Sequence, residues 1–480
     1  MFACFISSSL PLLCTFNKDL SIFFSNKFAQ SKENHYLCSR KTKDRDLAQL
    51  VAHTSGGREV AGSSPVIPTF SKTESQKILS LYCFHYHISL SEPLNTMYFW
   101  KTRNLPNTRI DVADALRGIA VAGIILYHAV EHFDVFTKKT ILYSLPIDQM
   151  VGKTMAWLLS GKMYGIFAML FGLSFFIMND NQQQKGRSFS GRFAWRMCLL
   201  FGFGLINVAF YDGDILMLYA VYGLLLIPIS YLPLRVVWCI IGLLAIQPIE
   251  LYCLLTGKTI DNTTLFELYN YILGVHENGT FWENVVANLR YGFELNFRYN
   301  IFSGRLTQLL CLFILGMQLG RQRLFYQERL RIGKHSSVTN LHCWHIVLCT
   351  SSAAVIGMSF VDFGKLAMWL NPVYNLFILL MIVSAVVSVW YAFEGVRRVL
   401  HHLCVFGRMS LTNYLLQSII GTFIFYDYGL ACYYKLGITY AVLVGLAMVI
   451  GQYAFCRYWF KHHPRGPLEG LWRKLTWIGK

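Results

Sequence analysis

Residues 111–128 read DVADALRGIAVAGIILYH, a largely apolar stretch that contains an arginine, Arg117, and a histidine, His128. With its neighbours it predicts a membrane-spanning helix over Ala113–Phe133, because a crossing needs about 20 mostly apolar residues. At about 3.6 residues per turn, Arg117 and His128 share one face of that helix, roughly 16 Å apart along its axis. Ionisable residues are costly inside a bilayer, so their presence on one stripe indicates a functional site.

The composition of the whole chain is typical of a membrane protein. Hydrophobic residues make up 54% of the 480 residues and charged residues only 14%, whereas soluble proteins carry about 25% charged residues. The apolar runs are continuous rather than alternating, which favours helices over strands. We therefore expect an all-α bundle of about ten membrane helices. The expected spans are Ala113–Phe133, Met163–Met178, Phe193–Tyr211, Ile215–Leu232, Leu234–Leu255, Leu306–Leu319, Trp344–Phe360, Pro372–Phe393, Met409–Tyr426 and Ile438–Tyr458.

The distribution of charge predicts an orientation. The net charge is +17, and the lysines and arginines concentrate in alternate connections, which is the positive-inside pattern. We expect both ends of the domain in the cytoplasm, residues 256–305 as an outer loop and residues 459–480 as a cytoplasmic tail. This pattern assigns the basic charge to topology and argues against a nucleic-acid partner. The thirteen cysteines are scattered through apolar runs, so neither a disulfide framework nor a metal cluster is expected.

Residues 1–96 differ from the rest of the chain, because they are polar and lack helical periodicity. Two short stretches, LAQLV (47–51) and GSSPV (62–66), back-translate to the D-arm and T-arm sequences of a transfer-RNA gene, in the same order and spacing. We therefore expect this region to be a spurious translation of an upstream gene, with the true start near Met97. The alternative is a genuine disordered extension. Residues 97–480 are expected to form a single multi-pass membrane domain.

Two parts of the sequence resemble the YeiB-like family of bacterial integral membrane proteins. One is RIDVADALRGIAVAGIIL (109–126), and the other is GRMSLTNYLLQS (407–418) followed by Gln452 and GPLEGLWR (466–473). Together they extend the resemblance over everything from Met97 on. The family looks like a branch of the transmembrane acyltransferase superfamily. This resemblance implies a bacterial inner-membrane enzyme that takes an acyl group from cytosolic acyl-CoA, its co-substrate, and delivers it to a glycan or lipid acceptor on the far side, with no permanently bound cofactor.

The residues around His128 are candidates for catalysis. His128, Glu131 and His132 are spaced i, i+3 and i+4, so they share a helix face. His128 could take a proton from an acceptor hydroxyl or amine while Glu131 orients its ring. Two alternatives stay open. His128 could simply hydrogen-bond a neighbouring helix, or the H-x-x-E-H pattern over 128–132 could bind zinc, although no third ligand is identifiable. The preferred interpretation involves no metal.

Four arginines are candidates for binding the phosphates of acyl-CoA, because guanidinium groups fit phosphate oxygens in pairs. They are Arg117, Arg192, Arg196 and Arg408. The alternative for Arg117 is an ion pair with Asp114, one helical turn away, or a side chain that extends to the interface. The other three also satisfy the positive-inside pattern without any further role.

Four further residues are candidates for lining the substrate cavity. Asp212 and Asp214 lie between the third and fourth spans, and Asn413 and Gln417 belong to a polar stripe on the ninth. The aspartates could instead cap helices, and the amides could hold neighbouring membrane helices together. A small-molecule transporter that uses the same intramembrane polar residues is the second functional hypothesis. Against it, the sequence gives no convincing pair of Gly/Pro-broken half-helices. The partners expected are the bilayer and an envelope acceptor, and the oligomeric state stays open.

Overall fold

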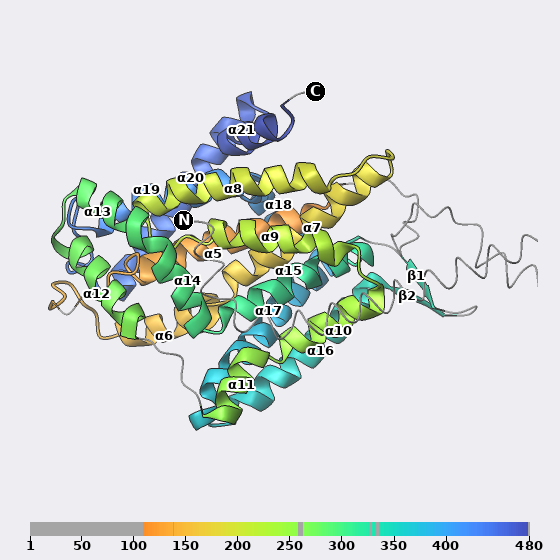
Figure 1. Cartoon of the computed structure of the whole chain (residues 1–480), viewed down its shortest axis with the longest axis horizontal. Helices are drawn as coiled ribbons and strands as arrows, with labels where there is room; N and C mark the ends of the chain where they lie inside the picture. The colour runs from red at the N-terminus through yellow and green to blue at the C-terminus, as the bar shows by residue number, and fades with distance from the viewer. Residues whose placement is uncertain (1–108, 138, 258–262, 327–328, 333–335, 479–480) are drawn as a thin grey trace, which may run out of the picture. The chain divides into compact units, whose positions relative to one another are not determined.

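The computed structural model describes residues 109–137, 139–257, 263–326, 329–332 and 336–478, and these form an α-helical membrane bundle (Figure 1), which confirms the predicted fold class. Expectations about residues 1–96 and about a start at Met97 lie outside the described residues. One short antiparallel hairpin, β1 (Arg329–Ile332) and β2 (Ser336–Thr339), interrupts the helices. The helices are α5 (Asp111–Val130), α6 (Asp148–Leu159), α7 (Met163–Gln183), α8 (Ser190–Phe210), α9 (Leu216–Ser230), α10 (Leu234–Ala245), α11 (Pro248–Thr256), α12 (Thr263–Asn278), α13 (Phe281–Ala287), the π-helical η1 (Asn288–Gly292), α14 (Phe293–Phe302), α15 (Arg305–Arg321), α16 (Asn340–Ser359), the 3₁₀ turn η2 (Gly364–Leu366), α17 (Ala367–Ala392), α18 (Glu394–Gly407), α19 (Ser410–Phe425), α20 (Ile438–His462) and α21 (Pro467–Thr476).

Every expected span coincides with a helix or with a bent pair of helices. Among the described residues, six helices are long and apolar enough to cross a membrane, or up to eight if each of two bent pairs is one span. The expected number of ten is reached only if α9, with 15 residues, and α19, with 16 residues, also cross. The protein is thus a multi-pass membrane protein, while the number of ten spans and the orientation of the two ends stay predictions.

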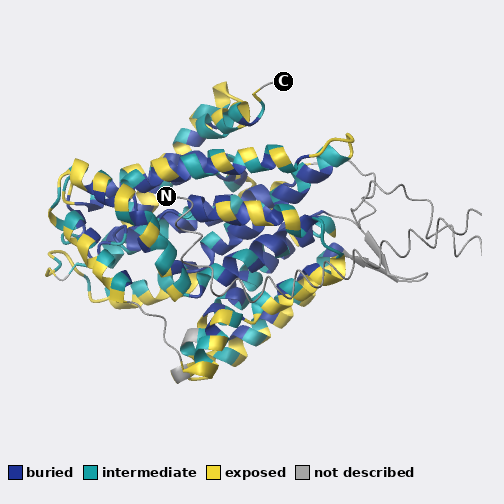
Figure 2. Cartoon of the chain, viewed as in Figure 1, coloured by how far each residue is buried: buried dark blue, intermediate teal, exposed yellow. Residues whose placement is uncertain are grey.

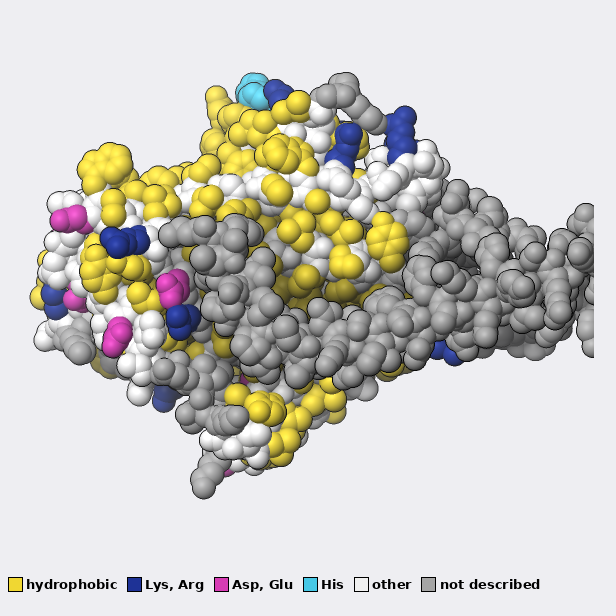
Figure 3. Space-filling view, viewed as in Figure 1, with side chains coloured by type: hydrophobic (Ala, Val, Ile, Leu, Met, Phe, Trp, Pro, Cys, Tyr) yellow, Lys and Arg dark blue, Asp and Glu magenta, His cyan; other side chains and the backbone are white. Residues whose placement is uncertain are grey.

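The surface supports the membrane assignment. Hydrophobic side chains dominate much of the described surface along α8 and α9 (Figure 3). A soluble monomer rarely exposes so large an apolar area, because contact with water is unfavourable, whereas lipid accepts it. The exposed residues on these two helices include Leu205, Ile206, Val221, Leu224 and Leu225.

Helix α5 lies at the centre of the bundle, with neighbours α7, α18 and α20 (Figure 2). Two thirds of its most apolar stretch (67%) is buried, against 17% for α16 and 22% for α20, which face outward. Glycines permit this close packing. A Cβ atom on Gly407 of α18 would collide with the Asp114 carbonyl oxygen of α5, and one on Gly118 would collide with the Leu403 carbonyl oxygen of α18. The centre of the fold is therefore the helix that carries Arg117 and His128.

A second close contact joins α7 and α15. A Cβ atom on Gly172 would collide with the carbonyl oxygen of Phe313, and one on Gly316 would collide with that of Met169. Each helix thus places a glycine against the backbone of the other. Small residues allow membrane helices to approach in this way, so that van der Waals contact can hold them together.

The region between α11 and α15, expected as an outer loop, is largely helical. It contains α12, α13, η1 and α14, and α13 and η1 pack against α8. Thr280 begins α13 with a capping box, in which its hydroxyl accepts from the Glu283 backbone N–H and the Glu283 carboxylate accepts from the Thr280 N–H. Such T-x-x-E sequences begin helices. This pattern was present in the sequence and could have predicted the helix start.

The C-terminal helix α21 completes the first turn of α19. The carboxylate of Glu469 accepts hydrogen bonds from the backbone N–H groups of Leu411 (2.8 Å) and Thr412 (3.0 Å), and from the Thr412 hydroxyl (2.8 Å). The first N–H groups of a helix have no partner inside the helix, and a carboxylate satisfies them. The expected tail is thus in part a docked helix, and the contact joins the motifs GRMSLTNYLLQS and GPLEGLWR.

Candidate functional site

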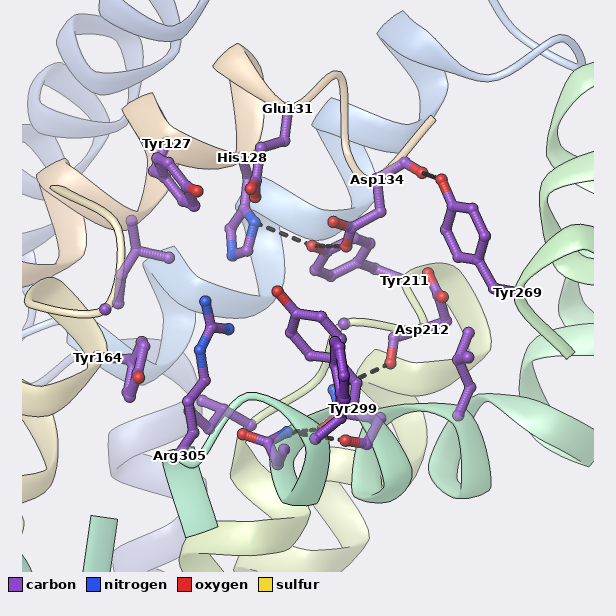
Figure 4. A pocket seen from close by; sticks show the side chains of 18 of the residues that line it. Tyr127, His128, Glu131, Asp134, Tyr164, Tyr211, Asp212, Tyr269, Tyr299 and Arg305 are labelled. Atoms are coloured by element: carbon purple, nitrogen blue, oxygen red, sulfur yellow. Dashed lines mark hydrogen bonds between the residues drawn. The ribbon is translucent and has the colours of Figure 1, made fainter. Parts of the chain in front are cut away.

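A cavity of about 470 Å³ lies around the C-terminal end of α5 (Figure 4). The start of α7, the turn between α8 and α9, and residues of α12, α14, α15 and α19 form its other walls. Its size falls within the range of small-molecule binding sites. His128 and Glu131 line it, together with Asp134 and Asp212.

His128 is held by a chain of hydrogen bonds. The Tyr211 hydroxyl lies 2.9 Å from His128 Nδ1 and donates its proton to Asp134 (Figure 4). A phenol has one proton, so Tyr211 must accept from Nδ1–H if it donates to the carboxylate. This chain of hydrogen bonds therefore selects the Nδ1–H tautomer of His128 and leaves a lone pair on its Nε2 atom. Within the described part of the chain, no hydrogen bond to Nε2 is present, and this nitrogen faces the cavity.

A strained turn places Asp134 beside Tyr211. Three successive residues after α5, namely His132, Phe133 and Asp134, have positive φ angles of 51°, 56° and 66°. Residues with side chains adopt this left-handed region rarely, at about 1–2 kcal/mol each. The turn reverses the chain directly after the helix, so that the Asp134 carboxylate points back to the phenol next to His128.

Burial changes the acidity of the carboxylates outside the spans. Burial, followed by the charge of Asp212, raises the pKa of Asp134 from 3.8 to about 6. Burial likewise raises the pKa of Asp212 from 3.8 to about 6. Both groups therefore titrate within the range in which bacteria live, and their charge depends on each other.

Arg305 approaches His128 from the other side of the cavity (Figure 4). It is the first residue of α15, and the preceding Gly304 has a φ of 68°. Between Phe281–Phe302 and Arg305–Arg321 the chain bends by 84°. The guanidinium carbon lies 5.1 Å from the ring centre of Tyr164 and 5.0 Å from that of Tyr299. The bend and the two rings together direct the cation into the cavity.

Of the two other catalytic candidates, one lines the cavity and one does not. Glu131 lines the cavity with His128. His132 does not line it, because its Nε2 lies 2.9 Å from the Leu436 carbonyl oxygen and its ring packs against Phe425. The H-x-x-E-H pattern therefore does not bring its two histidines to one point. Among the described residues, no three His, Cys, Asp or Glu side chains are grouped so that they could hold a metal ion.

Arg117 lies about three helical turns before His128 on α5 and does not line the cavity. Its guanidinium forms an ion pair with Asp114 (2.7 Å) and donates to the Ser174 hydroxyl (2.6 Å). Asp114 also binds Arg109 through two hydrogen bonds of 3.0 and 2.6 Å. The predicted alternative of an ion pair with Asp114 is therefore present.

The remaining arginine candidates are not gathered in one pocket. Arg196 lies over the Trp472 ring of α21 (3.6 Å), and Arg192 lies over the ring of Trp477 (4.3 Å), which follows that helix directly. Arg408 lies over the Phe460 ring at 4.5 Å. These are stacking contacts that attach the C-terminal helices to the bundle.

A different basic cavity, of about 400 Å³, lies at the opposite end of α5 from His128. Trp390, Tyr391 and Tyr326 provide its aromatic walls. Its charged lining comes from Arg109, Asp111, Arg397, Arg398 and His401.

Of the four substrate-lining candidates, Asp212 lines the His128 cavity. Asp214 instead accepts from the Met217 N–H (3.0 Å) at the start of α9 and from the Asn207 amide (2.9 Å). Asn413 hydrogen-bonds Cys456 of α20 (3.3 Å), and Gln417 is fully buried. The contacts of Asp214 and Asn413 are those of helix capping and helix packing, whereas the Gln417 amide has no hydrogen-bond partner among the described residues.

The chain matches known sequences over most of its length. Residues 319–479 match a family described as "Protein of unknown function (DUF418)". Over 404 residues the chain is 27% identical to "Uncharacterized protein YxaH" of Bacillus subtilis (strain 168). The aligned residues make up 78% of this chain and 96% of YxaH. Over 89 residues it is 39% identical to "Uncharacterized protein YeiB" of Escherichia coli (strain K12), covering 18% of this chain and 22% of YeiB.

These matches support the predicted YeiB-like family: the family model covers residues 319–479, and the similarity to YxaH extends over 78% of the chain. A third relative is "Uncharacterized 39.9 kDa protein in amylase 3'region" of Bacillus acidopullulyticus, 23% identical over 401 residues, which is 78% of this chain and 95% of that protein. The names of these YeiB-like proteins state no activity. The function therefore has to be argued from the cavity.

Proposed function

We propose that this protein is an acyltransferase of the bacterial inner membrane, in which His128 is the general base. The observation that carries the proposal is the hydrogen-bond chain from Asp134 through Tyr211 to His128, which leaves Nε2 open to the cavity. A neutral histidine held in one tautomer by a carboxylate-linked partner suits proton removal in acyl transfer. The sequence resemblance to the transmembrane acyltransferase superfamily supports the same conclusion.

In the proposed reaction, the acceptor oxygen or nitrogen attacks the thioester carbonyl carbon while Nε2 of His128 takes the acceptor's proton. The tetrahedral adduct then loses the sulfur with the electron pair of the C–S bond. The imidazolium returns its proton to this thiolate, so that CoA leaves as the thiol and the acyl group stays on the acceptor. Glu131 lines the same cavity, and its carboxylate favours the imidazolium when it is ionised.

We place the nucleotide part of acyl-CoA in the basic cavity at the other end of α5. The cationic side chains of Arg109, Arg397 and Arg398 suit phosphate, and the walls of Trp390 and Tyr391 suit stacking with a base. Helix α5 has 20 residues and therefore separates its two ends by roughly 30 Å. The acyl group would pass along α5, where Arg117 and Ser174 are the polar groups between the ends.

The test uses purified protein in nanodiscs with acetyl-CoA, and water as the acceptor. The variant His128→Ala should lower CoA release by about 10²–10⁴-fold, because general-base catalysis contributes that much. The variant Tyr211→Phe should lower it less, since Nε2 remains but its tautomer is no longer fixed. CoA should be quantified by chromatography, because the exposed free cysteines Cys198, Cys239 and Cys349 would react with thiol reagents.

The matched control is His402→Ala, which removes an exposed histidine of α18 that lines neither cavity. It should keep the rate of the unchanged protein. Equal CoA release by the unchanged protein and His128→Ala, with both proteins folded, would contradict the proposal.

A carrier is the second candidate function, and one observation favours it. The sequence predicted no broken half-helices, but two bent pairs are present: α10 with α11 at 46°, and Phe281–Phe302 with α15 at 84°. The second break carries Arg305 into the cavity. Broken helices that line a polar cavity are typical of secondary transporters. Uptake of a solute into proteoliposomes without acyl-CoA would support this function over acyl transfer.

A further inference from the structure

The cavity beside His128 has two ends of opposite charge (Figure 4). We propose that it binds a zwitterionic ligand, with an anionic group such as a phosphate or carboxylate at Arg305 and an ammonium group at Asp212 and Asp134. This inference goes beyond the proposed function, because it concerns the ligand and does not require acyl transfer.

The first end is cationic. Among the cavity-lining residues that the structure describes, Arg305 is the one Lys or Arg side chain and supplies the positive charge. Lys162 follows Gly161 of the cavity wall, is only 3% exposed, and its charge repels that of Arg305. In the described part of the chain, no carboxylate oxygen lies within 4.0 Å of either group, although four other arginines have such pairs. The charge of Glu131 acts on Arg305 within the same cavity. Among the described residues, however, neither cation has a directly paired carboxylate, which is unfavourable until an anion binds.

The contacts of Arg305 also determine what it can bind. The rings of Tyr164 and Tyr299 hold the guanidinium by its faces, at 5.1 and 5.0 Å. The Tyr164 side chain also hydrogen-bonds the guanidinium. The remaining N–H donors point outward from the edges of the guanidinium plane, and the face contacts do not occupy them. A guanidinium presented in this way donates two parallel hydrogen bonds to a phosphate or carboxylate.

The second end is anionic. Asp212 is 6% exposed, and its Oδ1 atom is buried without a hydrogen-bond partner in the part of the chain that the structure describes. Asp134 lies on the same side of the cavity, and the phenol rings of Tyr211 and Tyr269 lie around the two carboxylates (Figure 4). An ammonium group has three donors for these oxygens, and phenol rings attract a cation.

A single ligand with both charges fits better than a ligand with one. A simple anion at Arg305 would leave the buried Asp212 oxygen unpaired, and a simple cation at Asp212 would leave Arg305 unpaired. A neutral sugar would leave both charges without a partner, which is costly in a buried site. Between the two ends lies His128 (Figure 4), so the middle of a zwitterion would be next to Nε2.

The inference is tested by calorimetric titration of the full-length protein in detergent with four probes. Glycerophosphoethanolamine carries both charges, glycerophosphate only the anion, ethanolamine only the cation, and N-acetylglucosamine neither. Glycerophosphoethanolamine should bind at least about 10-fold more tightly than each of the others, as expected for one added charged hydrogen bond. Equal affinity for the neutral sugar or for either half would overturn the inference on the unchanged protein alone.

Variants assign the two ends. Arg305→Gln should weaken binding of the two phosphate-bearing probes by about 10-fold or more and leave ethanolamine unchanged. Asp212→Asn should weaken glycerophosphoethanolamine and ethanolamine by a similar factor and leave glycerophosphate unchanged. The matched control is Arg298→Gln, which removes an exposed arginine of α14 that pairs with Glu294 outside the cavity. If Arg305→Gln binds all probes like the unchanged protein and has the same thermal unfolding midpoint, the inference is wrong.

Nanodiscs distinguish the source of the ligand. A higher thermal unfolding midpoint in phosphatidylethanolamine nanodiscs than in phosphatidylglycerol nanodiscs would identify the ligand as a lipid head group. Equal midpoints in the two lipids, together with binding of soluble glycerophosphoethanolamine, would identify it as a solute. His128→Ala should retain the binding. CoA release without zwitterion binding would overturn this inference only, and zwitterion binding without CoA release would overturn the acyltransferase only.

Discussion

At the scale of single residues, the candidate site is a histidine held by partners that are distant in the sequence. The sequence pointed to His128 because a histidine inside an apolar span is unusual. Its partner Tyr211 lies 83 residues away, and Arg305 comes from a different helix. Pairings of this kind depend on how helices pack, which no local pattern encodes. Asp134 was within reach of prediction, since it follows the span directly, but the left-handed turn that aims it at Tyr211 was not.

A prediction at this scale concerns the pH dependence of CoA release. Because the pKa of Asp134 is raised to about 6, its carboxylate loses its charge as the pH falls through that value, and the hydrogen-bond chain to His128 weakens. CoA release should therefore fall below about pH 6 in the unchanged protein. Asp134→Asn should lower the rate by at least about 10-fold at neutral pH. It should also remove the fall in rate below about pH 6, which is the acid limb of the pH profile. The measurement is the rate of CoA release from pH 4.5 to 8.5.

The comparison variant for this profile is Asp212→Asn. The charge of Asp212 contributes to the raised pKa of Asp134, so its removal should move the acid limb to lower pH. An acid limb that persists unchanged in Asp134→Asn would show that another group controls it, and the assignment of Asp134 would fail.

At the scale of elements, glycines set the distance between helices. The sequence predicted where most spans lie, because apolar length is local information. It did not predict that α12, α13 and α14 would replace a loop, since aromatic and amide residues gave no clear apolar face. It also did not predict which helices meet. The motif GPLEGLWR was recognised as a family signature, but its physical role, capping α19 through Glu469, requires the folded chain.

A prediction at this scale concerns the crossing of α7 and α15. Gly316→Ala should destabilise the protein by roughly 1–3 kcal/mol, because an added methyl group would push against the Met169 backbone rather than a movable side chain. The control is Gly202→Ala on α8, where a Cβ would meet no atom within 4 Å. Thermal unfolding in detergent checks both. If Gly316→Ala and Gly202→Ala unfold at the same temperature, the close contact between α7 and α15 at Gly316 is contradicted.

At the scale of the whole molecule, buried acids at one end of the bundle link folding to pH. Burial raises the pKa values of Asp134 and Asp212 to about 6 and that of Asp214 to about 7, from 3.8. Between pH 3.8 and these values the folded protein binds more protons than the unfolded chain. Raising the pH therefore favours unfolding in this window, and the effect levels off above it.

A prediction at this scale uses Asp214→Asn. The variant should gain stability relative to the unchanged protein as the pH rises from about 4 to 7, and the difference should stay constant above pH 7. The asparagine fits at position 214, because Asn207 Oδ1 has no partner among the described residues. The Asn207 amide can turn so that this oxygen accepts from the new side-chain amide at position 214. Unfolding midpoints at pH 4.5, 6, 7 and 8 test this, and a difference that does not change with pH would contradict it.

The cap on α19 has a consequence for biosynthesis. Glu469 is translated 58 residues after Leu411 and 57 after Thr412, whose N–H groups it satisfies. The first turn of α19 therefore stays uncapped until translation has reached α21. A nascent chain that stalls before α21 would carry open N–H donors at this helix end, which the finished molecule does not.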